Sequence, residues 1–183
     1  LVVNNDELSK RLSSYLKPPA QSPDERRWKQ QDAKWKRQKN ARQKKQEKYH
    51  ADWKKIFSER LDEARAAVTN NPGIITNPLH YLHEQARDRS STTGRWTEYN
   101  WKTLITEYGE EVAHFYRDST VSFWRHYIPK LRSEGAPINK TSYGVIIGLT
   151  GIEIEAIETE DWPKNMSNGD VELACKYASF ELN

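Results

Sequence analysis

The residues RRWKQQDAKWKRQKNARQKKQEK, at positions 26–48, decide how the rest of this chain is interpreted. They include eleven lysines or arginines and only two acids, Asp32 and Glu47, so the local formal charge is +9. The chain of 183 residues has 29 basic and 26 acidic residues, which leaves 18 basic and 24 acidic residues outside this stretch. The sequence therefore joins one dense cationic segment to a mildly acidic remainder.

The cationic stretch is predicted to belong to one long helix over residues 23–68. Ser22 precedes Pro23, and Glu25 follows three residues after Ser22, which is the spacing of a capping box. No glycine or proline follows until Pro72, and good helix formers dominate the composition. A helix of this length would span about 70 Å, so part of it is expected to project or to form a bridge.

The apolar positions of this helix predict which half of it packs. At about 100° per residue, one stripe contains Trp28, Trp35, Trp53, Phe57, Ala64 and Val68. The stripe is interrupted over residues 36–48, where polar residues take its positions. We expect the C-terminal half to pack on a folded body. The middle is expected to be wet, with positive residues around the helix instead of along one side.

The remainder of the chain also has helical spacing, and no two strands joined by a hairpin turn are visible. Helices are predicted over residues 5–17, after Asn77, on both sides of Gly109, over residues 143–159, and after a capping Ser167. Residues 88–94 are predicted to form a loop. Glycines 144, 148 and 151 would form a small face on which another helix sits closely.

These patterns predict an all-α fold with seven or eight helices. It is expected to be an irregular helical bundle or a solenoid-like stack with one long basic helix. Three regions are expected: a short N-terminal helix and Pro-rich linker over residues 1–22, the long basic helix over residues 23–68, and a helical body over residues 69–183.

The basic segment is the candidate nucleic-acid contact, because lysine and arginine neutralise phosphates and aromatic rings can stack on exposed bases. The candidate contact residues are Arg26, Arg27, Trp28, Lys29, Lys34, Trp35, Lys36, Arg37, Lys39, Arg42, Lys44, Lys45 and Lys48. The alternatives are a helix face that is simply solvated, or a helix that docks on an acidic surface. Membrane binding is disfavoured because the segment lacks a continuous apolar face.

No other constellation in the sequence indicates catalysis, and we expect neither an enzyme nor a cofactor or metal site. His80 and His83 share a helical face but lack further ligands at a recognisable spacing, so a surface or half-buried pair is expected. Cys175 is expected to be a small buried residue of the last helix. Carboxylate pairs such as Glu153 and Glu155 are interpreted as solvent-face charges.

Three features bear on the cellular context. The single cysteine fits a reducing compartment, and no apolar run reaches the length that spans a bilayer. The first residues do not form a signal peptide, and the lone Met166 leaves the chain without an initiator methionine. We therefore expect a cytoplasmic fragment of a longer polypeptide, without membrane contact.

Three segments carry a resemblance to a known class of proteins. They are FWRHYIPKLRSEG at 123–135, GVIIGLTGIEIEA at 144–156 and ELACKYASFELN at 172–183. Over residues 101–183 the chain resembles the helical, HEAT-like region of very large bacterial multidomain proteins, often NTPase-containing and associated with anti-phage defence. The resemblance implies a scaffold or sensor region and carries over no functional residues.

Two functions are therefore expected from the sequence. The first is a non-catalytic α-helical scaffold or partner-recognition module, whose partners are other domains of the same longer protein or a separate protein. The alternative is a nucleic-acid-binding module that uses residues 26–48. The two differ in their sensitivity to salt, because binding through several phosphates weakens steeply as salt rises.

Overall fold

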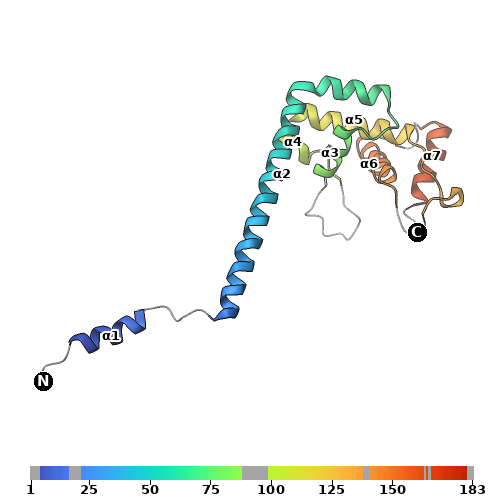
Figure 1. The fold of residues 1–183 in the computed structure, drawn as a ribbon. Helices are drawn as coiled ribbons and strands as arrows, with labels where there is room; N and C mark the ends of the chain where they lie inside the picture. The colour runs from blue at the N-terminus through green and yellow to red at the C-terminus, as the bar shows by residue number, and fades with distance from the viewer. Residues whose placement is uncertain are drawn as a thin grey trace. The chain divides into compact units, whose positions relative to one another are not determined.

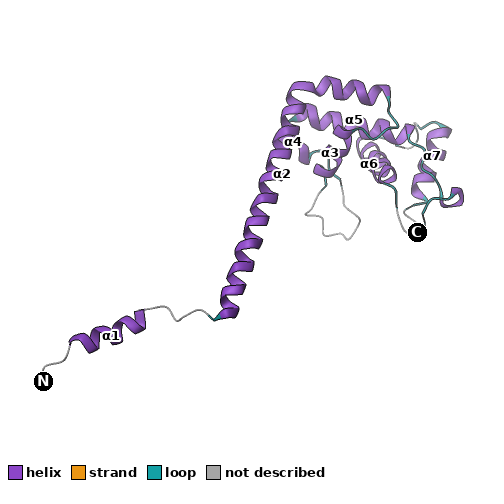
Figure 2. Cartoon of the chain, in the orientation of Figure 1, coloured by secondary structure: helices purple, strands orange, loops and turns teal. Residues whose placement is uncertain are grey.

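The structure, a computed structural model, describes residues 5–16, 22–87, 99–137, 141–162, 164 and 166–180. Within these residues the fold contains seven α-helices and no strand, apart from an isolated antiparallel bridge between Arg87 and Tyr99 (Figure 2). This confirms the all-α prediction. The predicted loop over residues 88–94 lies outside the described residues.

The helices follow the predicted order. They are α1 (Asn5–Leu16), α2 (Pro23–Asn70), α3 (Asn77–Gln85), α4 (Thr103–Tyr108), α5 (Glu110–His126), α6 (Tyr143–Glu158) and α7 (Asn168–Ala178), with a short 3-10 helix η1 (Arg132–Glu134) before α6 (Figure 1). Gly109, at φ 87°, separates α4 from α5, as the sequence predicts. The cap of α3 is Thr76 instead of Asn77, since the Thr76 hydroxyl accepts a hydrogen bond from the Leu79 amide.

The chain divides into two compact units, residues 1–52 and residues 53–183. The boundary falls inside α2, whereas the expected division placed all of residues 23–68 in one region. The difference has a packing cause, because Trp53 stacks on Tyr81 of α3 with ring centroids 4.7 Å apart. Phe57, Ala64 and Val68 are buried, so the C-terminal part of α2 belongs to the helical body, as its apolar stripe predicts.

Helix α2 is kinked at Arg60, where φ is −137° and ψ is 28°. Helix kinks usually coincide with proline or glycine, and neither residue occurs near this position. The predicted long helix is therefore confirmed as Pro23–Asn70, but it has a kink that the sequence analysis did not anticipate. The kink lies within the second unit, well after residues 26–48.

Helix α5 is the common packing partner of the body. It contacts α3, α4 and α6, and α6 contacts α7 in turn. Tyr116, Phe123 and Trp124 of α5 are fully buried. An irregular bundle around one helix accounts for this pattern better than a stack in which each helix meets only its sequence neighbours.

The glycines of α6 allow its neighbours to come close, as predicted. A Cβ atom on Gly151 would collide with the backbone carbonyl of Thr120 in α5. A Cβ atom on Gly148 would instead collide with the ring of Tyr177 in α7. The small face of α6 therefore packs against two neighbouring helices.

The prediction that Cys175 is buried is wrong, because this thiol lies on the exposed side of α7.

We expect Gly151→Ala to lower the free energy of unfolding by about 1–3 kcal/mol, because the added methyl group meets backbone atoms of α5 that cannot rotate away. Gly169→Ala is the matched control, since the nearest atom, Ser167 Oγ, would be 3.8 Å from the new Cβ atom. That change is expected to be neutral or to stabilise by up to about 1 kcal/mol. Urea unfolding followed by circular dichroism measures both, and equal stabilities of the two variants would contradict the close approach.

Candidate nucleic-acid interface

The basic segment, residues 26–48, begins directly after a well-formed helix cap. The Ser22 hydroxyl accepts a hydrogen bond from the Glu25 amide at 3.1 Å, and the Glu25 carboxylate accepts one from the Ser22 amide at 3.0 Å. This reciprocal pair is the predicted capping box. The only non-helical backbone conformation inside α2 is at Arg60, so the basic segment is a regular helix throughout.

Every candidate cation of the basic segment is exposed to solvent. The residues are Arg26, Arg27, Lys29, Lys34, Lys36, Arg37, Lys39, Arg42, Lys44, Lys45 and Lys48. Among the described residues, one of them has an acidic partner: Lys36 Nζ lies 2.8 Å from Asp32 Oδ2, one helical turn away. The expected wet middle of the helix is therefore confirmed, and most of its charge is uncompensated.

In the second part of α2, acidic side chains one turn away compensate the positive charges. Beyond residue 53, ion pairs one turn apart join Lys55 to Glu59, Arg60 to Glu63 and Arg65 to Asp62. Acidic residues alternate with basic ones there, as is usual for a solvated helix face. The basic segment departs from this pattern because its sequence contains only two acids.

Two large aromatic side chains of the basic segment are also exposed. Trp28 is 67% exposed and Trp35 is 58% exposed, although indole rings usually contribute strongly to cores and interfaces. Their separation of seven residues places them about 10 Å apart along the helix axis. Lys39 Nζ lies 5.3 Å from the centroid of the Trp35 ring, so one indole already has a cation above it.

The two histidines of α3 have different environments. His83 is fully buried, stacks on Tyr99 and pairs through Nδ1 with the Tyr116 hydroxyl at 2.8 Å. His80 is exposed. No group of three or more potential ligands occurs in the part of the chain that the structure describes. The expectation of a surface or half-buried pair holds for His80 but is wrong for His83, which is a core residue.

Burial lowers the pKa of His83 to about 3, with a further lowering from His80. The folded state keeps this imidazole neutral while the unfolded state takes up a proton below about pH 6.5, so stability must fall as the pH drops from about 6.5 toward 3. We expect His83→Gln to reduce this pH dependence by up to about 1.4 kcal/mol per pH unit between pH 6 and pH 4. Urea unfolding at a series of pH values measures it.

The exposed His126, whose Nδ1 lies 2.8 Å from the Ser122 carbonyl oxygen, provides the control for this experiment. His126→Gln makes the same substitution at an exposed position and is measured in parallel. A His83→Gln variant with the wild-type pH dependence would contradict the buried neutral imidazole.

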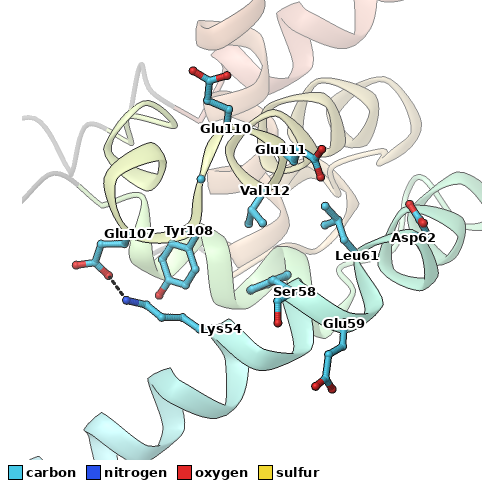
Figure 3. A pocket seen from close by; sticks show the side chains of 12 residues that line it. Lys54, Ser58, Glu59, Leu61, Asp62, Glu107, Tyr108, Glu110, Glu111 and Val112 are labelled. Atoms are coloured by element: carbon cyan, nitrogen blue, oxygen red, sulfur yellow. Dashed lines mark ion pairs between the residues drawn. The ribbon is translucent and has the colours of Figure 1, made fainter.

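The helical body has a cavity of about 540 Å³ between the C-terminal part of α2 and the α4–α5 junction (Figure 3). Phe57, Leu61, Tyr108 and Val112 contribute apolar surface to it. Five carboxylates surround the opening, from Glu59, Asp62, Glu107, Glu110 and Glu111. Lys54 adds one cation, 4.0 Å from Glu107. The carboxylates are exposed and do not converge on one point in the close-up, so the cavity is not arranged for acid–base chemistry.

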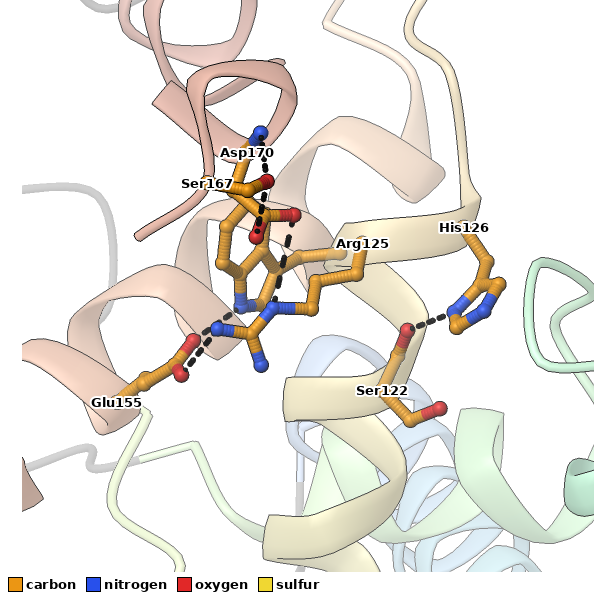
Figure 4. A network of polar contacts seen from close by, with 7 residues as sticks. Ser122, Arg125, His126, Glu155, Ser167 and Asp170 are labelled. Atoms are coloured by element: carbon orange, nitrogen blue, oxygen red, sulfur yellow. Dashed lines mark hydrogen bonds and ion pairs between the residues drawn. The ribbon is translucent and has the colours of Figure 1, made fainter. Parts of the chain in front are cut away.

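The sequence interpretation of Glu155 as a solvent-face charge is wrong. Its carboxylate accepts hydrogen bonds from Trp124 Nε1, at 2.8 Å, and from Arg125 Nη2 (Figure 4). Arg125 also lies 3.8 Å from Asp170, a residue in the first turn of α7. This network joins α5, α6 and α7, which gives it a clear role in packing.

Comparisons with protein families, with curated proteins and with solved structures found no match. The resemblance to defence-associated helical regions therefore stays a prediction, and so does the cytoplasmic location. Among the described residues, no helix is both long enough and apolar enough to cross a membrane.

Proposed function

We propose that this chain is a non-catalytic helical module that binds nucleic acid through the basic segment of α2. The observation that supports the proposal is the exposed and uncompensated charge of residues 26–48. Eleven cations carry one ion pair among the described residues, so the segment presents its charge to an external anion. A polyphosphate backbone is the biological anion whose charge density matches such a segment.

The helical body supports this function as a scaffold. Its buried core extends into α2 through Trp53 and Phe57, so the helix that carries the basic segment is anchored in the body at its C-terminal end. Recognition of a protein partner by the body remains a second expectation. The surface proposed for this recognition is the acid-rimmed cavity beside Tyr108.

Docking of the basic segment on an acidic surface is the alternative to this proposal. The charge-reversal variant described below distinguishes the two, because docking makes the fold depend on these cations.

The test is a fluorescence-anisotropy titration of the full chain with labelled DNA and RNA at several salt concentrations. We expect binding at low salt that weakens by about three orders of magnitude between roughly 50 and 200 mM salt, because contact with about five or six phosphates gives a slope near −5. Absence of binding at low salt, or binding that is insensitive to salt, would contradict the proposal.

Charge reversal of Lys36, Arg37, Lys44 and Lys45 to glutamate should abolish this binding. All four side chains are exposed, so the helix content measured by circular dichroism should remain that of the wild type. Loss of the fold in this variant would mean that the segment is packed against an acidic surface, and would count against the proposal.

A further inference from the structure

The positive residues of the basic segment are not evenly distributed around the helix. With Arg26 as origin and about 100° per residue, seven of the eleven cations fall within an arc of about 100°. They are Arg26, Arg27, Lys34, Arg37, Lys44, Lys45 and Lys48, named here the cationic stripe. The other four, Lys29, Lys36, Lys39 and Arg42, lie outside the arc. The expectation of positive residues all around the helix is therefore too coarse.

The other side chains of residues 26–48 are also distributed unevenly around the helix. Gln30 and Ala41 are the only other residues in the arc, and neither is charged. Asp32 and Glu47 lie more than about 100° from its centre, while Trp28 and Trp35 lie about 130–150° from it. One face of the helix is therefore cationic, and the opposite face contains the two indoles.

Ion pairs and cation–π contacts within the helix also distinguish the cations of the stripe from the others. The two cations with an intrahelical partner are Lys36, paired with Asp32, and Lys39, above the Trp35 ring. Both lie outside the stripe. Among the described residues, no ion pair or cation–π contact involves a residue of the stripe.

This arrangement is unfavourable for the isolated helix. Lys44 and Lys48 are like charges four residues apart, and such pairs destabilise a helix. Lys34, Arg37 and Lys45 have no acidic residue three or four positions away in either direction. A face whose only role was solubility would mix both signs of charge. The stripe instead presents one sign of charge only, which favours an anionic partner.

The dimensions of the stripe indicate which form of nucleic acid it fits. From Arg26 to Lys48 a regular helix rises about 33 Å, close to the length of one turn of duplex DNA, about 34–36 Å. A helix about 10–12 Å in diameter can also enter a major groove about 12 Å wide. Single-strand binding combines cations with stacking aromatics on one surface, and here the indoles are on the opposite face.

We infer that the cationic stripe is a contact surface for the phosphates of a nucleic-acid duplex, and that Trp28 and Trp35 take no part in this contact. The inference rests on the proposed function and divides its candidate residues into two sets. Phosphate contacts carry no sequence information, so the stripe would bind duplexes of different sequence with similar affinity.

The chain itself offers matched variants for the test. The stripe variant changes Arg37, Lys44, Lys45 and Lys48 to glutamine, and the off-stripe variant changes Lys29, Lys36, Lys39 and Arg42 to glutamine. Each removes three lysines and one arginine from the same helix, and glutamine is a good helix former. The two variants therefore lose the same number of charges from different faces. The off-stripe variant also loses the Lys36–Asp32 ion pair and the Lys39–Trp35 contact, so the helix content of both variants is compared by circular dichroism.

Binding is measured by anisotropy with a DNA duplex of roughly 20 base pairs, about two turns, and with one of its strands alone. We expect the duplex to bind more tightly than the strand. The stripe variant should lose about tenfold more duplex affinity than the off-stripe variant, and its salt slope should fall by about three to four. Trp28→Ala combined with Trp35→Ala should retain the duplex affinity of the wild type.

Other results separate the inference from the proposed function. Equal losses in both charge variants would overturn the stripe and leave nucleic-acid binding intact. Preference for the single strand, with loss of affinity in the tryptophan variant, would overturn it in favour of base stacking. Failure of the wild type to bind either probe would overturn both. If either quadruple variant loses helix content, two double variants replace them in the same measurements. The double variant on the stripe changes Lys44 and Lys45 to glutamine, and the one off the stripe changes Lys36 and Lys39 to glutamine.

Discussion

The regular hydrogen bonding of α2 between its cap at Ser22 and its kink at Arg60 is the constraint on which the rest of this account depends. A helix repeats every 3.6 residues, so an unbroken register converts a linear run of lysines and arginines into faces of different character. A break within residues 26–48 would rotate one half of the cations relative to the other. The stripe exists because the kink comes after the last of them.

The helical body depends on a different constraint, which is the close approach of α5 and α7 to α6. Gly148 and Gly151 allow α7 and α5 to reach the backbone of α6, and the carboxylate of Glu155 satisfies polar atoms at the same interface. The body is held by short-range packing and the basic segment carries long-range charge. These two kinds of interaction respond differently to salt, because buried contacts are screened much less than exposed charges.

Much of the fold could be predicted from local signals in the sequence. Ser22 with Glu25, Gly109, and Ser167 with Asp170 mark helix ends through local chemistry, and these boundaries are confirmed within a few residues. The kink at Arg60 could not be predicted, because no proline or glycine marks it. The burial of His83 and the role of Glu155 depend on partners 33 and 31 residues away, which no local pattern reveals.

The candidate site illustrates the same division. Its residues and their exposure follow from composition and from the interrupted apolar stripe, so the sequence was sufficient to find them. Their separation into two faces does not follow from the local charge of +9, because a net charge contains no information about the angle of each side chain around the helix.

The most direct test of this separation is an NMR titration with duplex DNA that follows the Nε–H signals of the four arginines in residues 26–48. Arg26, Arg27 and Arg37 belong to the stripe, whereas Arg42 lies outside it. We expect the first three signals to shift together as duplex is added, while the signal of Arg42 stays close to its position in the free protein. Equal shifts at all four arginines, or a shift centred on Arg42, would contradict it.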